Sequence, residues 1–532
     1  MELNVGTWTV VLLFVILIYK WITRNNTYFH NKPIPSMVAK PLFGSTGPLV
    51  LKKFSLNSFT EYIYRKYPDA KVFGLFDALT PIFVVRDPEL IKKITVKDFD
   101  HFVDHRPMFG NSENDNPYSI FGKTLFSMTG QKWRDMRATL SPAFTGSKMR
   151  KMFELVIECS DSVAQYFVSQ AKKSTIEVEL YDLCTRFGSD VIATCAFGIR
   201  MDSFRDRDND FYDNGKKMMR FERFSVALRM FALKFCPTLM GRLGIDIIDR
   251  DQVRYFSALI MDAVKQRQTK GITRSDMIQL LIQARKGTLK HNDEKENDEG
   301  FATAKESNIG RMSVASNMTD NEMIAQAFVF FLAGFDTVST TLTFLLYDLV
   351  MNKEVQQRLY EEIVATQESL QGKPLNYDIL QKMKYLDMVL TESMRLRPAI
   401  AFLNRLCVQD YELDDGQGLK FTIDKGTTVW IPTQGLQMDP KYYPNPNKFD
   451  PERFSDKNKT TIDPMTYLPF GVGPRNCIGS RFALMEIKAI AYHLLLHFSF
   501  ELNSKTPVPL NLRKGFTIIA AEGEVWIGLK AR

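Results

Sequence analysis

The sequence predicts a mainly α-helical fold with a small β region, preceded by a single membrane-spanning helix. Three observations lead to this expectation. Long stretches carry apolar residues at three- and four-residue spacing, a few short segments are rich in β-branched and aromatic residues, and one uninterrupted apolar run lies near the N-terminus. The chain has 532 residues, 45% of them hydrophobic and 24% charged, so it can bury a large core as ordinary globular proteins do.

The apolar run from Val5 to Ile22 predicts a membrane anchor within residues 1–24. As a helix this run is about 27 Å long, close to the hydrocarbon thickness of a bilayer. Basic residues follow it and Glu2 precedes it, so the positive-inside tendency leaves the rest of the chain in the cytosol. A cleaved signal peptide, the alternative, needs a basic start and a small-residue cleavage site. Prolines within residues 25–45 then predict a stiff connector to one domain spanning residues 46–532.

The first half of that domain begins with a strand pair and continues as helices. Lys71–Phe76 and Pro81–Arg86 are the expected strands, because β-branched and aromatic residues flank a turn region. Lys148–Gln170 and Val253–Lys265 show helical apolar spacing. Residues 286–318 are rich in charged and polar residues with few large apolar ones, which predicts a solvated loop.

The second half is centred on a long apolar helix. Thr319-Asp-Asn-Glu322 has the form of a capping box, and the helix that follows to about Val350 is apolar almost all round, as in the middle of a core. Further helices are expected as far as Arg397. Strands are then expected over Phe402–Glu412 and Phe421–Pro432, a last helix near Cys477, and short strands from Pro507 onward.

Charge and cysteine content exclude several classes of protein. The formal net charge of +8 favours an anionic membrane surface or an acidic partner, and no nucleic-acid-binding motif accompanies it. The six cysteines are irregularly spaced and fit neither a disulfide framework nor a paired zinc pattern, which indicates a reducing compartment.

The segment Phe470-Gly-Val-Gly473-Pro-Arg475-Asn-Cys477-Ile-Gly479 is the most informative in the sequence. A thiol at the start of a helix meets free N–H groups and the positive end of the helix dipole, which stabilise a thiolate. Gly473 permits a tight turn, Gly479 leaves room for a flat cofactor, Phe470 can shield the sulfur, and Arg475 can meet an anionic group. A dinucleotide-binding loop is disfavoured, because Asn476 occupies the place of its third glycine.

This pattern resembles the haem-binding loop of the cytochrome P450 family, and further motifs match in order over essentially the whole chain. The resemblance implies haem b with Cys477 as the proximal iron ligand. It also implies that the haem propionates meet Trp133 and arginine side chains, namely Arg137, Arg405, Arg475 and, as a weaker candidate, Arg106. The general form of the chain is similar to the microsomal branch that contains insect detoxifying enzymes and vertebrate drug- and steroid-oxidising ones.

The same resemblance assigns a role to two motifs that contain charged residues. Glu392 and Arg395 lie three residues apart on one helix face, which alone indicates only a surface ion pair. By resemblance they form a buried network with Arg453 that holds the loop carrying Cys477. Asp336 lies in the middle of the long apolar helix, where a carboxylate is costly unless it is paired or functional. By resemblance Gly334, Asp336 and Thr337 form the oxygen-activating site, at a local distortion of that helix.

These residues favour a monooxygenase that inserts one atom of O2 into lipophilic small molecules, either xenobiotics or endogenous lipids and hormones. The chain contains no flavin or dinucleotide fingerprint, so electrons must come from a partner. The resemblance implies an NADPH-dependent flavoprotein reductase, with cytochrome b5 as a further candidate, at the endoplasmic reticulum membrane. It also assigns phenylalanines to the substrate pocket: Phe109, Phe121, Phe328, Phe331, Phe402 and Phe516. Each of these could equally belong to the core.

Two alternatives remain open at this point. Some relatives with the same thiolate rearrange peroxides and need neither O2 nor electrons, although they tend to lack the Asp336–Thr337 type of acid–alcohol pair. A haem-based sensor or binding protein without turnover is the other alternative. His493 and His497 lie four residues apart on the last helix, but no third ligand accompanies them, so packed histidines are expected.

Overall fold

A computed structural model of the protein describes residues 5–107, 119–171, 174–220, 224–289, 300–305, 307, 309, 318–516 and 518–532. The chain separates into two compact units, each assembled from several stretches of sequence. Unit 1 comprises residues 1–106, 400–436 and 514–517, and unit 2 comprises residues 107–399, 437–513 and 518–532. The single domain expected for residues 46–532 stays a prediction.

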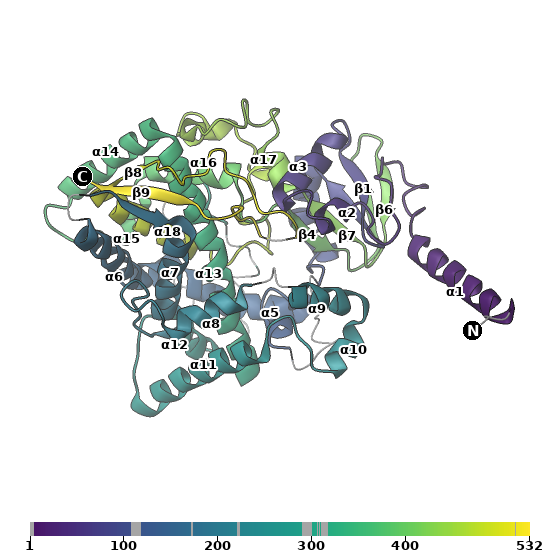
Figure 1. The fold of residues 1–532 in the computed structure, drawn as a ribbon, viewed down its shortest axis with the longest axis horizontal. Helices are drawn as coiled ribbons and strands as arrows, with labels where there is room; N and C mark the ends of the chain where they lie inside the picture. Colours follow the sequence, from purple (N-terminus) through teal and green to yellow (C-terminus); the bar gives the residue numbers. More distant parts are fainter. Residues whose placement is uncertain are drawn as a thin grey trace. The chain divides into compact units, whose positions relative to one another are not determined.

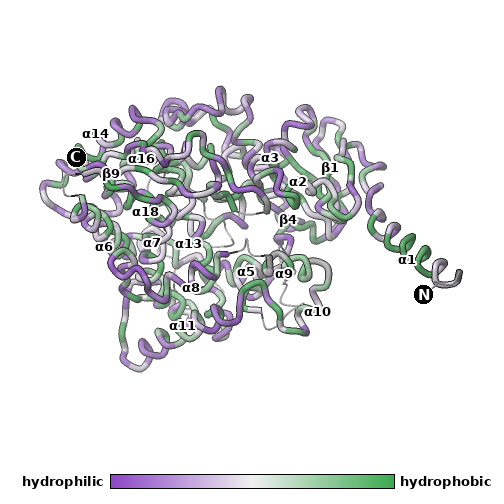
Figure 2. The backbone as a smooth tube through the Cα atoms, viewed as in Figure 1, coloured by the Kyte–Doolittle hydropathy of each residue, from purple (hydrophilic) through white to green (hydrophobic). Residues whose placement is uncertain are grey.

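The apolar N-terminal run forms helix α1 (Val5–Thr23), as predicted. Gly6–Thr23 is long and apolar enough to cross a bilayer, and none of it is buried. Figure 2 shows the hydrophobic colour along this helix. The long helix α13 (Asp320–Met351) also meets the length and hydropathy criteria, but most of it is buried, as expected of a core helix. Helix α1 therefore suggests a membrane anchor.

Unit 1 is built on a four-stranded sheet in the order β1-β2-β7-β4. Strands β1 (Val72–Asp77) and β2 (Thr80–Val85) pair antiparallel, which confirms the predicted strand pair. β7 (Thr428–Ile431) lies parallel to β2 and antiparallel to β4 (Leu403–Leu406). One face of this sheet packs on Phe59 and its apolar neighbours in a buried cluster.

The two longer strands expected between residues 402 and 432 are each divided in two. β5 (Tyr411–Asp414) and β6 (Lys420–Ile423) form a separate hairpin beside the main sheet. A turn separates β6 from β7, with Gly426 at φ +83°. The polar residues Asp424-Lys-Gly426 mark this turn in the sequence, and the prediction of one strand over Phe421–Pro432 overlooked them.

The remaining helical segments of unit 1 surround these strands. They are α2 (Gly47–Val50), α3 (Leu56–Lys66), α4 (Pro88–Lys92), the π-helical turn Lys93–Lys97 and the 3₁₀ turn Phe99–His101, while α17 (Thr433–Gln437) ends one residue beyond the unit.

Unit 2 is mainly helical and is organised around α13. The capping box at its start is present, with Thr319 accepting from the Glu322 N–H and Glu322 accepting from the Thr319 N–H. α13 packs against α7 (Leu180–Ile192), α16 (Lys384–Leu396) and α18 (Ser480–His497), as Figure 1 shows. α6 (Gly146–Gln170) and α11 (Arg250–Lys270) confirm the helices predicted from apolar spacing.

The other α-helices of unit 2 are short to medium in length. They are α5 (Gly130–Leu140), α8 (Asp210–Met218), α9 (Phe224–Phe235), α10 (Pro237–Arg242), α12 (Met277–Arg285), α14 (Lys353–Ser369) and α15 (Tyr377–Gln381). Single turns occur at Phe121–Lys123, Ser141–Phe144, Ala193–Phe197, Pro451–Phe454, Lys459–Thr461 and Pro464–Thr466. An antiparallel sheet in the order β3-β9-β8 joins β3 (Ile176–Glu179), β8 (Phe498–Glu501) and β9 (Trp526–Ala531).

Candidate functional site

The loop that carries Cys477 is shaped by two glycines with positive φ. Gly471 and Gly473 have φ of 74° and 75°, a region open to glycine but unfavourable for most residues. The Cys477 N–H donates to the Phe470 carbonyl at 2.8 Å and thereby closes the loop. Helix α18 begins at Ser480 with Gly479 as its N-cap, so Cys477 precedes the helix by three residues rather than opening it.

Cys477 is exposed as a residue although the chain crowds its sulfur. Desolvation by the surrounding loop raises the pKa of its thiol. The Gly479 N–H and the positive charge of Arg137 act in the opposite direction and stabilise the thiolate. A ligand can approach this residue, while the loop fixes the position of its sulfur.

Helix α5 brings two of the predicted side chains to this loop. The Arg137 guanidinium donates to the backbone and side-chain oxygens of Asn476, at 2.8 and 2.9 Å. Trp133, which is 1% exposed, lies under the guanidinium of Arg475 at 4.3 Å from its ring centroid. Arg475 also donates to the Met128 carbonyl at 2.6 Å. Helical spacing therefore places Trp133 and Arg137 on the face of α5 that meets the cysteine loop.

The two other arginines expected at the propionates belong to unit 1. Arg106 forms an ion pair with Asp77, with 2.9 Å between the nitrogen and oxygen. Arg405 is 1% exposed on β4, and burial lowers the pKa of its guanidinium to about 10. Their contact with a propionate stays a prediction.

The predicted network of Glu392, Arg395 and Arg453 is assembled in unit 2 and is buried. Glu392 accepts from Arg395 at 2.6 and 2.9 Å, and the Arg453 Nε lies 3.4 Å from the same carboxylate. Arg395 also donates to the carbonyls of Gln437 and Pro446, at 2.8 and 2.7 Å. Desolvation raises the pKa of the Glu392 carboxyl, and Arg395 opposes that shift. The network joins α16 to the irregular segment that leads towards the cysteine loop.

Part of the predicted solvated loop is instead packed beside this network. Within residues 286–318 the structure describes 286–289, 300–305, 307, 309 and 318. The ring of Phe301 lies 5.2 Å from that of Phe454 and 5.4 Å from that of Tyr467, and Ala302 is buried. A Cβ at Gly300 would come within 2.1 Å of the Asp387 carboxylate, so only glycine fits there. Phe301 and Ala302 therefore pack into unit 2, whereas Lys305 is exposed, and the solvated loop expected over 286–318 stays a prediction.

This packed segment reaches the residue that precedes the cysteine. The Asn476 side-chain amide donates to the Lys305 carbonyl at 2.6 Å, while its oxygens accept from Arg137. Asn476 is thus held from both sides, and the backbone of Cys477 is fixed with it. The small apolar island Phe301-Ala-Thr-Ala, inside an otherwise polar stretch, is the signal that could have predicted this contact.

Gly334 and Thr337 lie three residues apart on α13, whereas Asp336 projects from another face of the helix. The Thr337 hydroxyl donates to the Ala333 carbonyl at 2.5 Å, and both of these residues have accessible surface. Asp336 instead points towards α7, where it accepts from the Tyr181 hydroxyl at 3.1 Å. A Cβ at Gly334 would come within 3.0 Å of Ile192, so close helix packing accounts for this glycine.

The distortion expected in α13 is not observed. The helix is continuous from Asp320 to Met351. The hydroxyls of Thr337 and Thr341 bond back to carbonyls four residues earlier, which α-helical geometry tolerates without opening.

The phenylalanines assigned to a substrate pocket have varied surroundings. Phe331 is fully buried among the rings of Phe211, Phe256 and Phe335, and the Phe328 ring also contacts Phe256, which favours the core alternative for both. The remaining four do not share one setting. In unit 2 Phe121 contacts Phe126; in unit 1 Phe402 stacks on Trp430 and Phe516 is 42% exposed, while Phe109 is outside the described residues.

The donor set around Cys477 fits a haem. The sulfur of an exposed cysteine supplies an axial ligand, and Arg137 and Arg475 supply cationic groups of the kind that bind carboxylates. A Cβ at Gly479 would meet only Phe144, at an ordinary contact distance of 3.8 Å, so the chain leaves space at this glycine. Among the described residues, no group of three or more His, Cys, Asp or Glu side chains is placed to hold a separate metal ion.

The two histidines of α18, His493 and His497, are not arranged to bind a metal ion. His493 lies 3.8 Å from the Asp161 carboxylate, and burial lowers the pKa of its imidazole to about 4. A neutral, buried ring is the packed histidine that the sequence predicted.

Comparison with known proteins agrees with this geometry. The family described as Cytochrome P450 matches residues 34–525. The chain is 43% identical to cytochrome P450 9e2 of Blattella germanica, over 99% of this chain and 98% of that protein. It is 41% identical to a probable cytochrome P450 9f2 of Drosophila melanogaster over 99% of each chain, and 34% identical to cytochrome P450 3A41 of Mus musculus over 96% and 94%. The chain therefore belongs to the cytochrome P450 family and is a haem-dependent monooxygenase.

Proposed function

We propose that this enzyme oxidises lipophilic small molecules, with electrons from an NADPH-dependent flavoprotein reductase, at the cytosolic side of the endoplasmic reticulum membrane. Xenobiotics are the expected substrates, and endogenous lipids or hormones are a further class. The observation that carries the proposal is the exposed residue Cys477, whose thiolate is stabilised by the Gly479 N–H and by Arg137. Haem bound at this sulfur supplies the activation of O2.

Trp133, Arg137 and Arg475 are the residues of unit 2 that we propose hold the haem propionates, with Arg405 and Arg106 as candidates from unit 1. Arginine suits this task because its planar fork can bind a carboxylate through two nitrogens. The contacts of Arg137 with Asn476, and of Arg475 with Met128 and Trp133, support the proposal, since they fix both guanidinium groups beside the cysteine loop.

Thr337 and Asp336 are proposed to supply the protons that the reduction of O2 consumes. The Thr337 hydroxyl is on an accessible face of α13, and rotation of its O–H away from the Ala333 carbonyl would free the proton for donation. The peroxide-rearranging alternative does not reduce O2 and needs no protons for that step. The presence of the acid–alcohol pair therefore favours the monooxygenase.

The substrate class follows from the apolar character of the residues assigned to the pocket. Apolar pockets bind by contact area with few orienting polar groups, so they favour lipophilic compounds of varied shape. Phe121, Phe402 and Phe516 remain candidates for direct contact, because none of their rings is fully enclosed by the core.

In the proposed function, the membrane brings the enzyme and the reductase together. Helix α1 would place the enzyme beside a membrane-bound donor, which raises the frequency of encounters. We propose that Lys132, Arg134, Lys148, Arg150 and Lys151 form a basic docking face for an acidic partner. Within this face Arg150 forms an ion pair with Asp378 at 2.9 Å.

The test is a reconstitution of the full chain with haem and reductase in phospholipid vesicles. The probe is benzyloxyresorufin, a lipophilic ether whose dealkylation releases a fluorescent product. We expect product only when NADPH, reductase and O2 are all present, and a slower reduction as salt is raised. Equal conversion of an organic hydroperoxide with or without reductase, combined with no NADPH-dependent product from the ether, would support the rearranging alternative instead.

A further inference from the structure

The carboxylate of the proposed oxygen site is held by a tyrosine on the neighbouring helix. The Tyr181 hydroxyl donates to Asp336 Oδ1 at 3.1 Å. The start of α7 is itself fixed, because the Glu179 carboxylate caps it by accepting the N–H groups of Tyr181 and Asp182, at 3.1 and 2.6 Å. Burial and the nearby Asp336 raise the pKa of the Tyr181 phenol, so this group stays protonated and remains a donor.

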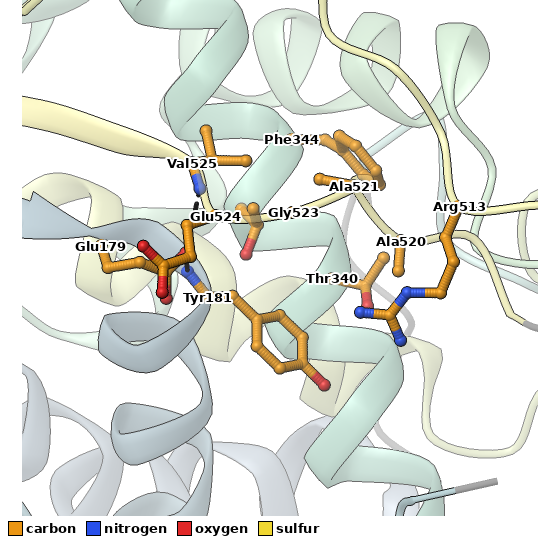
Figure 3. Close-up of a pocket in the computed structure, with 11 residues that line it drawn as sticks. Glu179, Tyr181, Thr340, Phe344, Arg513, Ala520, Ala521, Gly523, Glu524 and Val525 are labelled. Carbon is orange, nitrogen blue, oxygen red and sulfur yellow. Dashed lines mark hydrogen bonds between the residues drawn. The ribbon is translucent and has the colours of Figure 1, made fainter. Parts of the chain in front are cut away.

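Tyr181 also lines a pocket within unit 2. The pocket has a volume of about 290 Å³, and Figure 3 shows it between α13, the start of α7 and the C-terminal segment before β9. Helix α13 contributes Thr340, Thr343 and Phe344 to its wall. Thr340 and Thr343 lie four and seven residues after Asp336, so the three share one face of the helix. The pocket therefore begins about one helical turn from the Asp336 carboxylate.

The pocket extends from solvent to Tyr181, the residue whose hydroxyl bonds the Asp336 carboxylate. Its rim contains the exposed residues Arg513, Gly523 and Glu524, whereas Phe344 and Val525 are buried in its wall. The positive charge of Arg513 acts on the Tyr181 phenol and partly offsets the rise in its pKa, which places the guanidinium close to the ring. A volume of about 290 Å³ with hydroxyl, carboxylate and guanidinium groups on its walls has room and partners for several waters.

We propose that Tyr181 is a positioning residue that holds the Asp336 carboxylate about one helical turn from this pocket, so that water in the pocket supplies the protons of the reaction. The inference rests on the proposed role of Asp336. A proton passes from water to Asp336 and onward, and the hydroxide left behind is neutralised from bulk solvent through the rim. Tyr181 neither gains nor loses a proton overall, and nothing is oxidised or reduced in this step.

The central test compares Tyr181→Phe with Tyr212→Phe in the reconstituted holoenzyme. Tyr212 is a matched control, because its hydroxyl also contacts an aspartate of α7, Asp182, at 3.2 Å, but not Asp336. For Tyr181→Phe we expect unchanged haem content and an unchanged reduced carbon monoxide spectrum. The fraction of NADPH electrons recovered in resorufin should fall about tenfold, as for the loss of one charge-assisted hydrogen bond, with a matching rise in hydrogen peroxide. Tyr212→Phe should retain wild-type coupling.

A second readout does not depend on turnover. The midpoint temperature of haem loss should fall in Tyr181→Phe and in Asp336→Asn, and the double variant should fall no further than the lower single variant, because both remove the same contact. Additive falls in the midpoint temperature would overturn the positioning role. Equal coupling of NADPH to product in Tyr181→Phe and Tyr212→Phe would also overturn it. Loss of the thiolate spectrum in the wild-type chain would instead refute the proposed function itself.

The pocket is tested separately with Ala520→Leu, which narrows it without altering Tyr181 or Asp336. We expect a lower coupling of NADPH to product with an unchanged midpoint of haem loss. Wild-type coupling in this variant would overturn the pocket as the source of protons.

Discussion

At the scale of single residues, the ionisation of Cys477 depends on the balance between effects that raise and effects that lower the pKa of its thiol. Desolvation raises the pKa of the Cys477 thiol, while the Gly479 N–H and the Arg137 guanidinium lower it. An iron ion held by this sulfur would favour the thiolate further.

Thr337→Ala tests the alcohol of the proposed acid–alcohol pair. The variant loses the hydroxyl that bonds to the Ala333 carbonyl and one methyl group of a part-exposed side chain, so haem binding and the fold should be unchanged. Coupling of NADPH oxidation to product should fall, and hydrogen peroxide should rise by a similar amount, because protons reach the reacting oxygen less reliably. The loss should be about tenfold or more, as for other proton-transfer groups.

Thr366→Ala is the matched control for this variant. The Thr366 hydroxyl makes the same bond to a carbonyl four residues earlier, at 2.7 Å, but lies on α14. If both variants keep wild-type coupling, the hydroxyl of Thr337 has no part in proton delivery.

At the scale of elements, two buried contacts hold the segments around the cysteine loop. The Glu392–Arg395–Arg453 network joins α16 to the turn at Pro451–Phe454. The segment Gly300–Lys305 packs Phe301 beside this turn and bonds Asn476 through Lys305. Both contacts support the cysteine loop through neighbouring segments. Removing either contact should therefore reduce haem retention rather than change the oxidation reaction.

Glu392→Ala should yield protein that does not retain haem. The change leaves Arg395, which is fully buried, without its carboxylate, and breaking a buried ion pair in this way costs about 3–5 kcal/mol. Haem content per protein, measured after purification, gives the result. Glu354→Ala, at an exposed position of α14, should retain normal haem, and a normal haem content in Glu392→Ala would rule out the structural role.

Phe301→Ala should lower the midpoint temperature of haem loss, because it removes the ring between Phe454 and Tyr467 that anchors residues 300–305. The expected loss is about 1–3 kcal/mol of stability, as for a partly buried aromatic ring. Phe301→Leu should recover most of it. An unchanged midpoint in Phe301→Ala would show that the segment does not support the cysteine loop.

Sequence patterns predicted the elements with clear periodicity and missed contacts between distant segments. The capping box at Thr319, helix α6 and the strand pair β1–β2 follow from local spacing, and all are present. The hydrogen bond from Tyr181 to Asp336 joins residues 155 positions apart, and no local pattern marks it. The packing of Phe301 was hidden because the surrounding composition is that of a solvated loop.

At the scale of the whole molecule, two groups of exposed apolar side chains stand out among the described residues. One is α1, and the other comprises Leu228, Phe231, Leu239 and Leu243 on and after α9 and α10, each 54–58% exposed. Exposed apolar groups of this kind mark surfaces that meet a membrane or another apolar partner. Both groups are therefore candidate membrane contacts.

Deleting residues 1–24 should convert the enzyme from an integral to a peripheral membrane protein. The full chain should resist extraction by alkaline carbonate and yield only to detergent, because α1 buries its apolar surface in the bilayer. The shortened chain should be extracted by carbonate and should keep its thiolate spectrum. If it resists carbonate as the full chain does, α1 is not the membrane anchor.

The most direct test of the whole account is the carbon monoxide difference spectrum of the reduced enzyme, recorded for the wild-type chain and for Cys477→Ser. We predict the Soret band typical of thiolate-ligated haem in the wild type, and its loss together with all NADPH-dependent product in the variant. A variant that keeps this band and turns over the probe at the wild-type rate would contradict the assignment of Cys477 as the iron ligand.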